Sequence, residues 1–550
     1  MKKQIRLLLV LVGSVVLCSF QQKPRIVNIV NFIRQTEPRI AEITDDVLYQ
    51  TVASQVACLR QNHLKATFLL QYDALINSKY QKLLKELPAN NEIGGWWEVT
   101  QPHVKAAGLK WRGRYPWDWH ANVGFSTGYT PAERERLVDV YMAKFKEIFG
   151  KYPSSVGSWF IDAHTLAYMY EKYHIVASCN CRDQVGTDGY TMWGGYWGQA
   201  YYPSRKNAYM PAQTAVGQIP VPIFRMLGSD PIYQYDSGIG GVSQSVATLE
   251  PVYGSCGASR QWVDWFAKSM FENPCLGFTY TQAGQENSFT WNAMHTGYEM
   301  QMPIFAKLMR EGKIQVQTLT ETGKWYKSCY SVTPPTALSA LSDFREKNRK
   351  TVWYDSRYYR VNLLWEGDTF YIRDIHLFNE NYSSDYLYKA GTSTQCLYTT
   401  LPFVDGCLWS SDKLFAGLRF YAIDERGKMT EMKWGTPRLI SKGKSFKVEC
   451  PICESHVSFT ILFKEDRMEI TCNDQSKRFV WCMRLKALRQ NMPLPFTIIS
   501  HNRIDASQRG FDYHVVCKQG NLTDCRKNGD DDIFEITPEM QKVILDFKSL

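Results

Sequence analysis

The stretch that decides the fold reads Asn91-Glu92-Ile93-Gly94-Gly95-Trp96-Trp97-Glu98-Val99-Thr100-Gln101-Pro102-His103. It predicts a short apolar strand that stops abruptly at two tryptophans, a carboxylate, a proline and a histidine. In an α/β barrel the catalytic groups stand just past the C-terminal ends of the strands. Indole faces pack against the apolar C–H face of a pyranose, so the aromatics point to a sugar ring as the guest. We therefore expect Glu98 to be a catalytic carboxylate in a carbohydrate-active site.

On either side of this stretch, from Arg25 to about Ser328, predicted strands alternate with predicted helices. The best-marked helix has Thr130 as its cap, followed by a proline and an acid in the first turn, and it ends at Gly150. We count seven strands, most of them followed by a helix, which predicts a parallel sheet covered by helices. Seven units indicate a (β/α)7-type barrel over residues 24–332, and an open doubly wound sheet is the alternative.

The residue pattern changes after Thr333-Pro334-Pro335-Thr336. These residues predict a linker over residues 333–350. Residues 351–550 consist of short alternating or aromatic-rich runs separated by Gly, Asn, Asp and Ser. That pattern is typical of an antiparallel β-sandwich. We therefore expect an α/β protein in which a catalytic barrel is followed by an accessory β-sandwich domain.

The ends and the charge of the chain indicate export rather than nucleic-acid binding. Residues 1–20 resemble a secretory signal peptide, with a basic start and an apolar run too short to span a bilayer. Cys18 could be the acylated cysteine of a lipoprotein, and ordinary cleavage nearby is the alternative. The net charge of +10 is spread over 550 residues without a basic cluster, so we expect no nucleic-acid partner. We also expect no membrane span, and a location in the periplasm or at the cell surface.

Acids recur at the predicted strand ends, and two of them could form a catalytic pair. Hydrolysis of a glycosidic bond requires one carboxyl group to protonate the leaving oxygen and another to act as base or nucleophile. Glu98 and Asp162 are the first pair, because both directly follow apolar strands. Asp162 also precedes a helix and is a natural N-cap. Glu286 is the reserve partner.

Further side chains near the strand ends suggest a substrate-binding surface. Eight of the seventeen tryptophans lie in the range from Trp96 to Trp197. We therefore expect the aromatic residues to be concentrated at the mouth of the barrel, where its strands end. Arg34 suits a sugar hydroxyl or the carboxylate of an acidic sugar, and a salt bridge to Glu37 is the alternative. The residues that we expect to bind substrate are Arg34, Glu37, Trp97, His103, His164, Asp188, Trp193 and Glu286.

Two short motifs resemble the polysaccharide deacetylase (NodB-like) superfamily. Lys65-Ala66-Thr67-Phe68-Leu69-Leu70 is similar to its second-strand signature, and Asn91-Glu92-Ile93-Gly94 to the strand that follows. The resemblance implies a (β/α)7 barrel, a fold that also hosts glycosidases of the family 57 and family 38 types. The two-domain layout also resembles a family of exported bacterial proteins of unknown function.

The chain departs from the deacetylase pattern where that family binds zinc. The deacetylases carry two adjacent aspartates after the first strand, where this chain reads Asn31-Phe32-Ile33-Arg34. Their H-x-x-x-H pair is replaced by Trp97, Glu98 and His103. A hydrolytic zinc site needs about three protein ligands, and we do not find them.

The preferred hypothesis is therefore a metal-independent glycoside hydrolase that needs no cofactor and acts on an oligo- or polysaccharide. The first alternative is a metal-dependent deacetylase that uses Asp162, His164 and His103 as ligands. The second alternative is a non-catalytic carbohydrate-binding protein.

Overall fold

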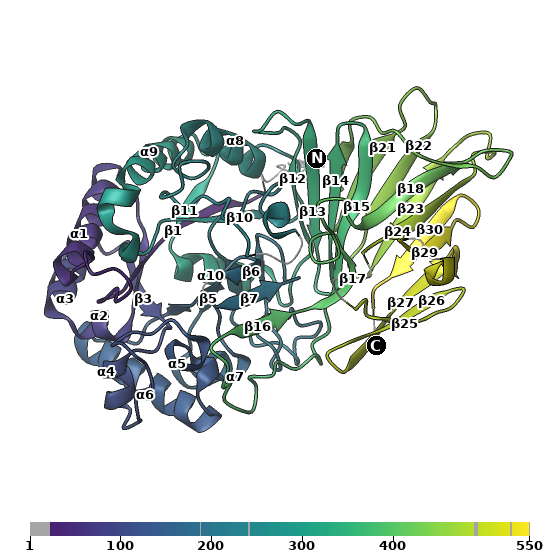
Figure 1. Ribbon diagram of the computed structural model, residues 1–550. Helices are drawn as coiled ribbons and strands as arrows, with labels where there is room; N and C mark the ends of the chain where they lie inside the picture. Colours follow the sequence, from purple (N-terminus) through teal and green to yellow (C-terminus); the bar gives the residue numbers. More distant parts are fainter. Residues whose placement is uncertain (1–22, 188, 240–242, 489–492, 529–530, 549–550) are drawn as a thin grey trace, which may run out of the picture.

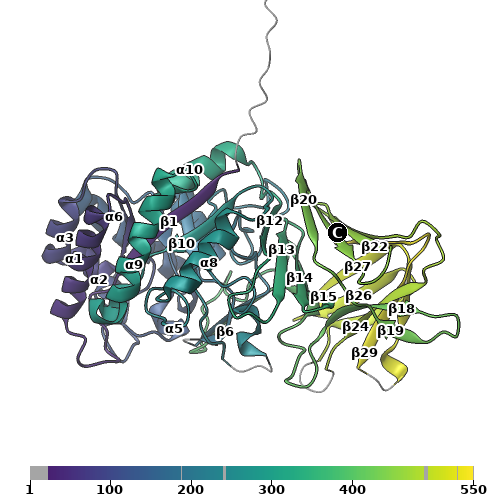
Figure 2. The ribbon, with the colours of Figure 1, turned by 90° about the horizontal axis from the view of Figure 1, so that it is seen from above.

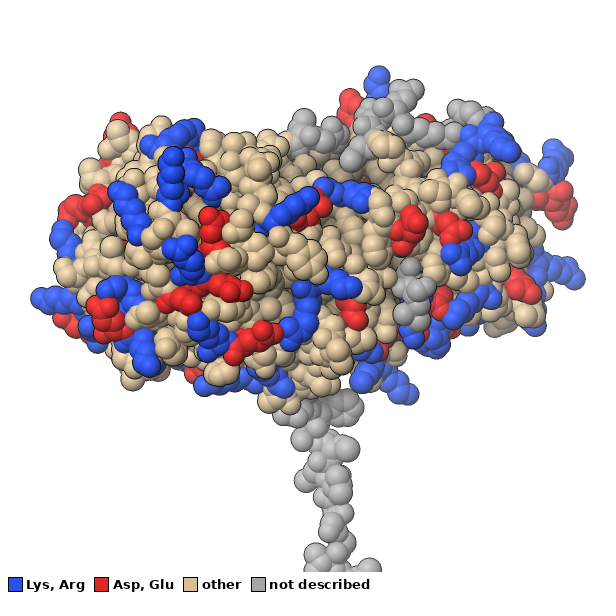
Figure 3. All heavy atoms as spheres, turned by 90° about the horizontal axis from the view of Figure 1, so that it is seen from below, with Lys and Arg blue, Asp and Glu red and all other residues tan. Residues whose placement is uncertain are grey.

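The computed structural model describes residues 23–187, 189–239, 243–488, 493–528 and 531–548. The signal peptide, Cys18 and Asp188 lie outside these residues. An α/β barrel and a region of two large antiparallel sheets lie side by side (Figures 1 and 2). Within the described ranges, no helix combines the length and apolar character needed to cross a bilayer. On the face drawn in Figure 3, basic and acidic side chains are interspersed.

The barrel is a curved sheet of seven parallel strands. Its order is β10 (Thr279–Ala283), β1 (Arg25–Ile33), β2 (Thr67–Leu70), β3 (Glu92–Trp96), β4 (Ser155–Gly157), β5 (Ala177–Asn180) and β9 (Ile223–Arg225). The short β8 (Ala200–Tyr201) adds to β9 in antiparallel fashion, and β11 (Gln315–Gln317) pairs with the first half of β1. Among the described residues no ladder joins β8 or β9 to β10. The barrel is therefore nearly closed, with one seam, and the doubly wound alternative is wrong.

Helices cover the outside of the barrel (Figure 1). The principal ones are α1 (Asp45–Gln61), α2 (Tyr72–Ile76), α3 (Ser78–Lys85), α4 (Gln101–Ala106), α6 (Pro131–Phe149), α7 (Ala163–Tyr173), α8 (Arg260–Phe271), α9 (Thr290–Arg310) and α10 (Leu319–Cys329). Helix α6 begins and ends where the sequence predicts. The Thr130 side chain accepts from the Glu133 amide in a capping box, and Gly150 ends the helix with a φ of 75°.

Strand alternation decides which side chains enter the barrel. Successive residues of a strand point to opposite faces of the sheet. Trp96 of β3 points inward, where it stacks on Phe32 with ring centroids 4.0 Å apart. Trp97 belongs to the cluster between sheet and helices, and Glu98 returns to the interior side.

The C-terminal half is a two-sheet antiparallel sandwich, as the sequence predicts. One sheet has the order β12 (Thr336–Ala340), β13 (Arg349–Asp355), β14 (Tyr359–Glu366), β15 (Thr369–Leu377), β18 (Gly417–Ile423), β24 (Trp481–Lys486), β29 (Asp532–Thr537) and β28 (Asn521–Asp524), with β17 (Leu401–Asp405) and β19 (Met429–Glu431) added at its side. The other has the order β20 (Arg438–Lys442), β21 (Ser445–Pro451), β22 (Ser458–Phe463), β23 (Arg467–Asn473), β30 (Lys542–Asp546), β27 (Phe511–Gln519), β26 (Arg503–Gln508) and β25 (Phe496–Ile499). Aromatic side chains join the two sheets, for example Trp481 against Phe459 at 4.9 Å.

The stretch expected to be a linker is part of the packed structure. Residues 336–340 form β12, which is fully buried, pairs with β13 and bridges to the barrel at Leu276. The halves also interdigitate, because β16 (Cys396–Thr399) runs parallel to β7 (Tyr190–Trp193) of a barrel loop, which in turn pairs with β6 (Gln184–Thr187). The barrel and the sandwich are thus joined by the three-stranded sheet of β16, β7 and β6 as well as by side-chain contacts.

Candidate active site

Three charged side chains converge at the C-terminal ends of the barrel strands, and we call Arg34, Glu98 and Glu286 the site cluster. They follow β1, β3 and β10, which are separate in sequence but meet at one mouth. Arg34 binds Glu98 in a bidentate pair, with Nη2–Oε1 at 2.7 Å and Nε–Oε2 at 3.0 Å. Its Nη1 lies 2.6 Å from Oε2 of Glu286. One guanidinium therefore lies between two carboxyl groups.

The loops after β1 and β10 are locked together beneath the cluster. The Asn287 side chain accepts from the Arg34 amide at 2.9 Å and donates to the Arg34 carbonyl at 2.8 Å. The Ser288 hydroxyl accepts from Arg34 Nη1 at 3.1 Å, and Gln71 donates to Glu98. Bidentate pairing and fixed loops hold the carboxyl groups in one geometry.

Aromatic rings form the wall of the site. The Arg34 guanidinium lies 4.2 Å from the centroid of the Trp117 ring, which is within cation–π range. A cavity of about 30 Å³ adjoins the cluster. Its lining residues are Arg34, Arg39, Glu98, Trp117, Trp119, Phe125, Trp159, Tyr190 and Glu286. That volume holds a water molecule or two, so a sugar ring needs the exposed Arg39 and the half-buried Trp119 at the rim to move aside.

The two acids of the cluster differ in their hydrogen-bond surroundings. Burial and the neighbouring Glu98 raise the pKa of Glu286 and Arg34 lowers it, which together bring it to about 7. The Arg34 contact with Glu286 lacks hydrogen-bond alignment, so Oε2 of Glu286 has no hydrogen-bond partner among the described residues. Glu98, by contrast, accepts three hydrogen bonds, two from Arg34 and one from Gln71. A pair of acids in such different surroundings suits separate acid and base roles.

Glu37 lies beside the cluster but does not pair with Arg34. Arg39 binds it through Nε and Nη2, both at 2.7 Å, and these bonds lower the pKa of Glu37 against the effect of its burial. The alternative of an Arg34–Glu37 salt bridge is therefore wrong. Glu37 instead fixes Arg39 at the rim.

Asp162 is not brought together with Glu98. It caps α7 by accepting from the Thr165 amide at 2.9 Å, and it binds Arg134 at 2.9 Å and the Ser126 hydroxyl at 2.6 Å. Both carboxylate oxygens are thus occupied, and Asp162 is absent from the lining of the cavity. Asp162 is therefore the N-cap of α7, the structural role that the sequence also allowed.

Trp97 and His103 lie in the core rather than at the mouth. The His103 ring stacks on Tyr72 at 4.6 Å, its Nε2 lies 2.8 Å from the Leu137 carbonyl oxygen, and burial lowers its pKa to about 4. Trp97 packs edge-on against His103 at 5.5 Å. Both face the helix layer, because Trp97 has the opposite orientation to Trp96 and Glu98.

The other expected residues are dispersed. His164 lies on the helix surface with Nε2 2.9 Å from Glu135. Trp193 is buried where barrel meets sandwich and donates to Asp405 at 2.8 Å. In the part of the chain that the structure describes, no three His, Cys, Asp or Glu side chains are grouped to hold a metal. The ligand set Asp162, His164 and His103 of the deacetylase alternative is therefore not assembled.

Several residues of the site were not expected from the sequence. Trp117 and Trp119 flank Asp118 in the long loop after β3, and Arg114 holds Asp118 through two bonds of 2.9 and 3.0 Å. This Trp-Asp-Trp run was the available signal, because an acid between two aromatics in a strand-end loop fits a structured binding wall. Gln71 carried no comparable signal.

Comparison with known proteins supports the architecture. No family model and no curated protein matches the sequence. Among solved structures, one from Parabacteroides distasonis, provisionally described as a glycoside hydrolase/deacetylase, is similar with a TM-score of 0.51 and 17% identity over 69% of this chain and 91% of that one. This similarity shows a shared fold and nothing further.

Two further solved structures match with lower TM-scores. A polysaccharide deacetylase from Mycobacterium smegmatis has a TM-score of 0.35 at 10% identity, covering 56% of this chain and 91% of that one. A 4-alpha-glucanotransferase from Thermococcus litoralis has a TM-score of 0.30 at 8% identity, covering 96% of this chain and all of that one.

Proposed function

We propose that this protein is an exported, metal-independent glycoside hydrolase acting on an oligo- or polysaccharide, with Glu98 and Glu286 as the catalytic pair. The observation that supports it is the convergence of two buried acids on Arg34 beside Trp117, at the barrel end where such folds bind substrate. Glu286 replaces Asp162 as the partner of Glu98. The fold likeness to a structure described as a glycoside hydrolase/deacetylase agrees with this proposal.

The chemistry assigns a different role to each acid. Glu286, with a pKa of about 7, is protonated in a large fraction of molecules at neutral pH and donates its proton to the leaving glycosidic oxygen. Glu98, which only accepts hydrogen bonds, either attacks the anomeric carbon or takes a proton from the attacking water. The C–O bond breaks, water supplies the hydroxyl group of the new reducing end, and Arg34 keeps both acids oriented.

The second candidate is a deacetylase, which the printed description of the Parabacteroides distasonis protein also names. That reaction would use Glu98 and Glu286 as base and acid on an N-acetyl or O-acetyl group. Release of acetate rather than of a reducing sugar distinguishes the two reactions.

The test is a glycan panel assayed for reducing sugar and for acetate, with and without a chelator. Glu98→Gln and Glu286→Gln should each lower glycoside hydrolysis by about 10²–10⁴-fold, and the chelator should have no effect on the wild type. Glu135→Gln is the matched control, because Glu135 is a half-exposed acid that pairs with His164. Acetate release, loss of activity with the chelator, or unchanged turnover in both site variants would contradict the proposal.

A further inference from the structure

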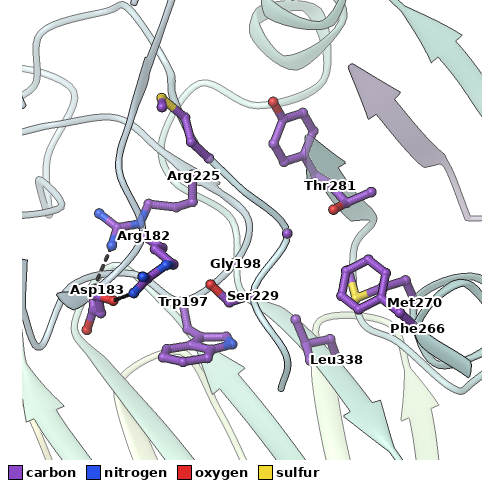
Figure 4. A pocket seen from close by; sticks show the side chains of 13 residues that line it. Arg182, Asp183, Trp197, Gly198, Arg225, Ser229, Phe266, Met270, Thr281 and Leu338 are labelled. Carbon is purple, nitrogen blue, oxygen red and sulfur yellow. Dashed lines mark hydrogen bonds and ion pairs between the residues drawn. The ribbon is translucent and has the colours of Figure 1, made fainter. Parts of the chain in front are cut away.

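A second cavity lies at the seam where the barrel fails to close, and it shares no residue with the candidate active site. Figure 4 shows its lining: residues after β5 and β9 face β10 and α8, and Leu338 of β12 closes the sandwich side. Its volume is about 20 Å³. That is room for one water-sized particle.

Arg182 lines this cavity and has no ion-pair partner among the described residues. Its side chain is 4% exposed and makes one hydrogen bond, from Nη1 to the Asp183 carbonyl oxygen at 2.8 Å. No carboxylate of the described chain pairs with it, and its Nε has no partner. A buried arginine without a compensating charge is costly, so the fold implies a negative partner.

Two buried carboxylates near this cavity, Asp183 and Asp374, are bound by other arginines. Asp183 binds Arg225 at 2.6 Å and Arg360 at 2.5 Å. Asp374 binds Arg360 in a bidentate pair at 2.8 and 2.9 Å. None of these three guanidinium–carboxylate contacts involves Arg182, and no carboxylate of the described residues lies within ion-pair distance of it.

The lining also offers more donors than acceptors. The unpartnered buried atoms among its residues are Arg182 Nε, Arg225 Nε, Tyr280 Oη and Thr281 Oγ1. An arginine side chain can only donate, and the two hydroxyls can both donate. A water molecule could satisfy some of these donors but would bring no negative charge.

At Gly228 the wall of the cavity leaves no room for a side chain. Gly228 has a φ of 57°, and a Cβ there would lie 2.6 Å from Oγ1 of Thr281. A side chain at this position would therefore displace the Thr281 hydroxyl and enter the cavity, so the absence of a Cβ keeps the cavity open.

From this buried guanidinium without an ion pair among the described residues, and from the surplus of hydrogen-bond donors around it, we propose that the seam cavity binds one halide-sized monovalent anion, with chloride as the physiological occupant. Arg182 supplies the charge, and the hydroxyls of Tyr280 and Thr281 complete the coordination. The anion would stabilise the open side of the barrel against the sandwich, independently of any catalytic activity.

Two measurements on the full-length protein test this site. Crystals soaked in sodium bromide should show an anomalous peak in the cavity. Thermal unfolding should occur ~2–4 °C higher in sodium chloride than in sodium gluconate at equal ionic strength. Arg182→Gln should lose both the peak and the chloride effect.

The matched control is Arg60→Gln, because exposed Arg60 also makes a single bond to a backbone carbonyl, that of Glu86 at 2.8 Å. It should keep the full chloride response. A wild-type crystal without the bromide peak would overturn the proposal, even if Arg182→Gln fails to fold. A stabilisation that sodium acetate gives and chloride does not would overturn it as well, because it would show a carboxylate site.

Discussion

Two buried ion triads in this molecule each consist of one arginine and two carboxyl groups, but their surroundings differ. In the site cluster, Arg34 lies between Glu98 and Glu286. In the second, which we call the junction cluster, Arg360 lies between Asp183 and Asp374, where barrel meets sandwich. Each arginine is buried and contacts two acids. The two clusters differ in the hydrogen bonds that their carboxyl groups accept from other residues.

Every acid of the junction cluster has further donors. Asp183 accepts from Arg225, Tyr209 and the Gly194 amide, and Asp374 accepts from Tyr235 at 2.7 Å. In the site cluster, Glu286 has an unaligned contact with Arg34 and a raised pKa. A triad that is fully satisfied holds two domains together, whereas a triad with one under-satisfied acid beside a cavity is suited to proton transfer.

The largest expected effect comes from breaking the junction cluster. Arg360→Met leaves Asp183 and Asp374 buried with less compensation, so we expect a loss of about 3–5 kcal/mol in the free energy of unfolding. Urea titration followed by tryptophan fluorescence measures it. Arg260→Met, which breaks an exposed pair with Asp264, should cost at most about 1 kcal/mol. Equal losses in the two variants would mean that the junction cluster does not join the domains.

The sequence predicted the architecture because the strands and their caps are local signals. The alternation of strands and helices, the Thr130 cap and the short runs of the sandwich can each be read within about twenty residues. Strand alternation could also have separated Trp97 from Trp96, because a strand that sends Glu98 inward must send Trp97 outward. The choice of Trp97 for the site overlooked that rule.

The pairing of charges could not be predicted in the same way. Arg34 and Glu98 are 64 residues apart, and only closure of the barrel brings them together. Asp162 lies both at the end of a predicted strand and at the start of a predicted helix, so the sequence allows a catalytic role and an N-cap. In the structure it is the N-cap, and its carboxylate is bound by Arg134 from another helix. Residues 333–350 contain two consecutive prolines, yet Thr336–Ala340 becomes a buried strand because β13 is beside it.

An intermediate effect should follow from the raised pKa of Glu286. Its ordinary value is 4.5 and its folded value about 7, so proton binding stabilises the fold fully below pH 4.5. That stability is lost as the pH rises through 7. Each pH unit between the two values is worth about 1.4 kcal/mol. Glu286→Gln cannot titrate, so it should gain up to ~3 kcal/mol relative to the wild type between pH 4.5 and 8.

Urea titrations at pH 4.5 and pH 8 measure this change, and Glu37→Gln is a control of opposite sign. Arg39 lowers the pKa of Glu37, so Glu37 contributes stability above its unfolded pKa and loses that contribution as the pH falls. Glu37→Gln should therefore lose stability relative to the wild type as the pH rises. If Glu286→Gln differed from the wild type equally at both pH values, Glu286 would not have the raised pKa on which its acid role depends.

The smallest effect should come from His164, which the sequence analysis placed at the site and the structure places on the helix surface. Its pair with Glu135 is partly exposed on both sides, with 29% and 40% of the side chains accessible. Pairs of this kind contribute about 0–1 kcal/mol. His164→Gln should therefore change the urea midpoint little and leave turnover and bound metal unchanged. A fall in turnover comparable to that of Glu98→Gln would instead return His164 to the site and favour the metal-dependent deacetylase, in which His164 is a ligand, over glycoside hydrolysis.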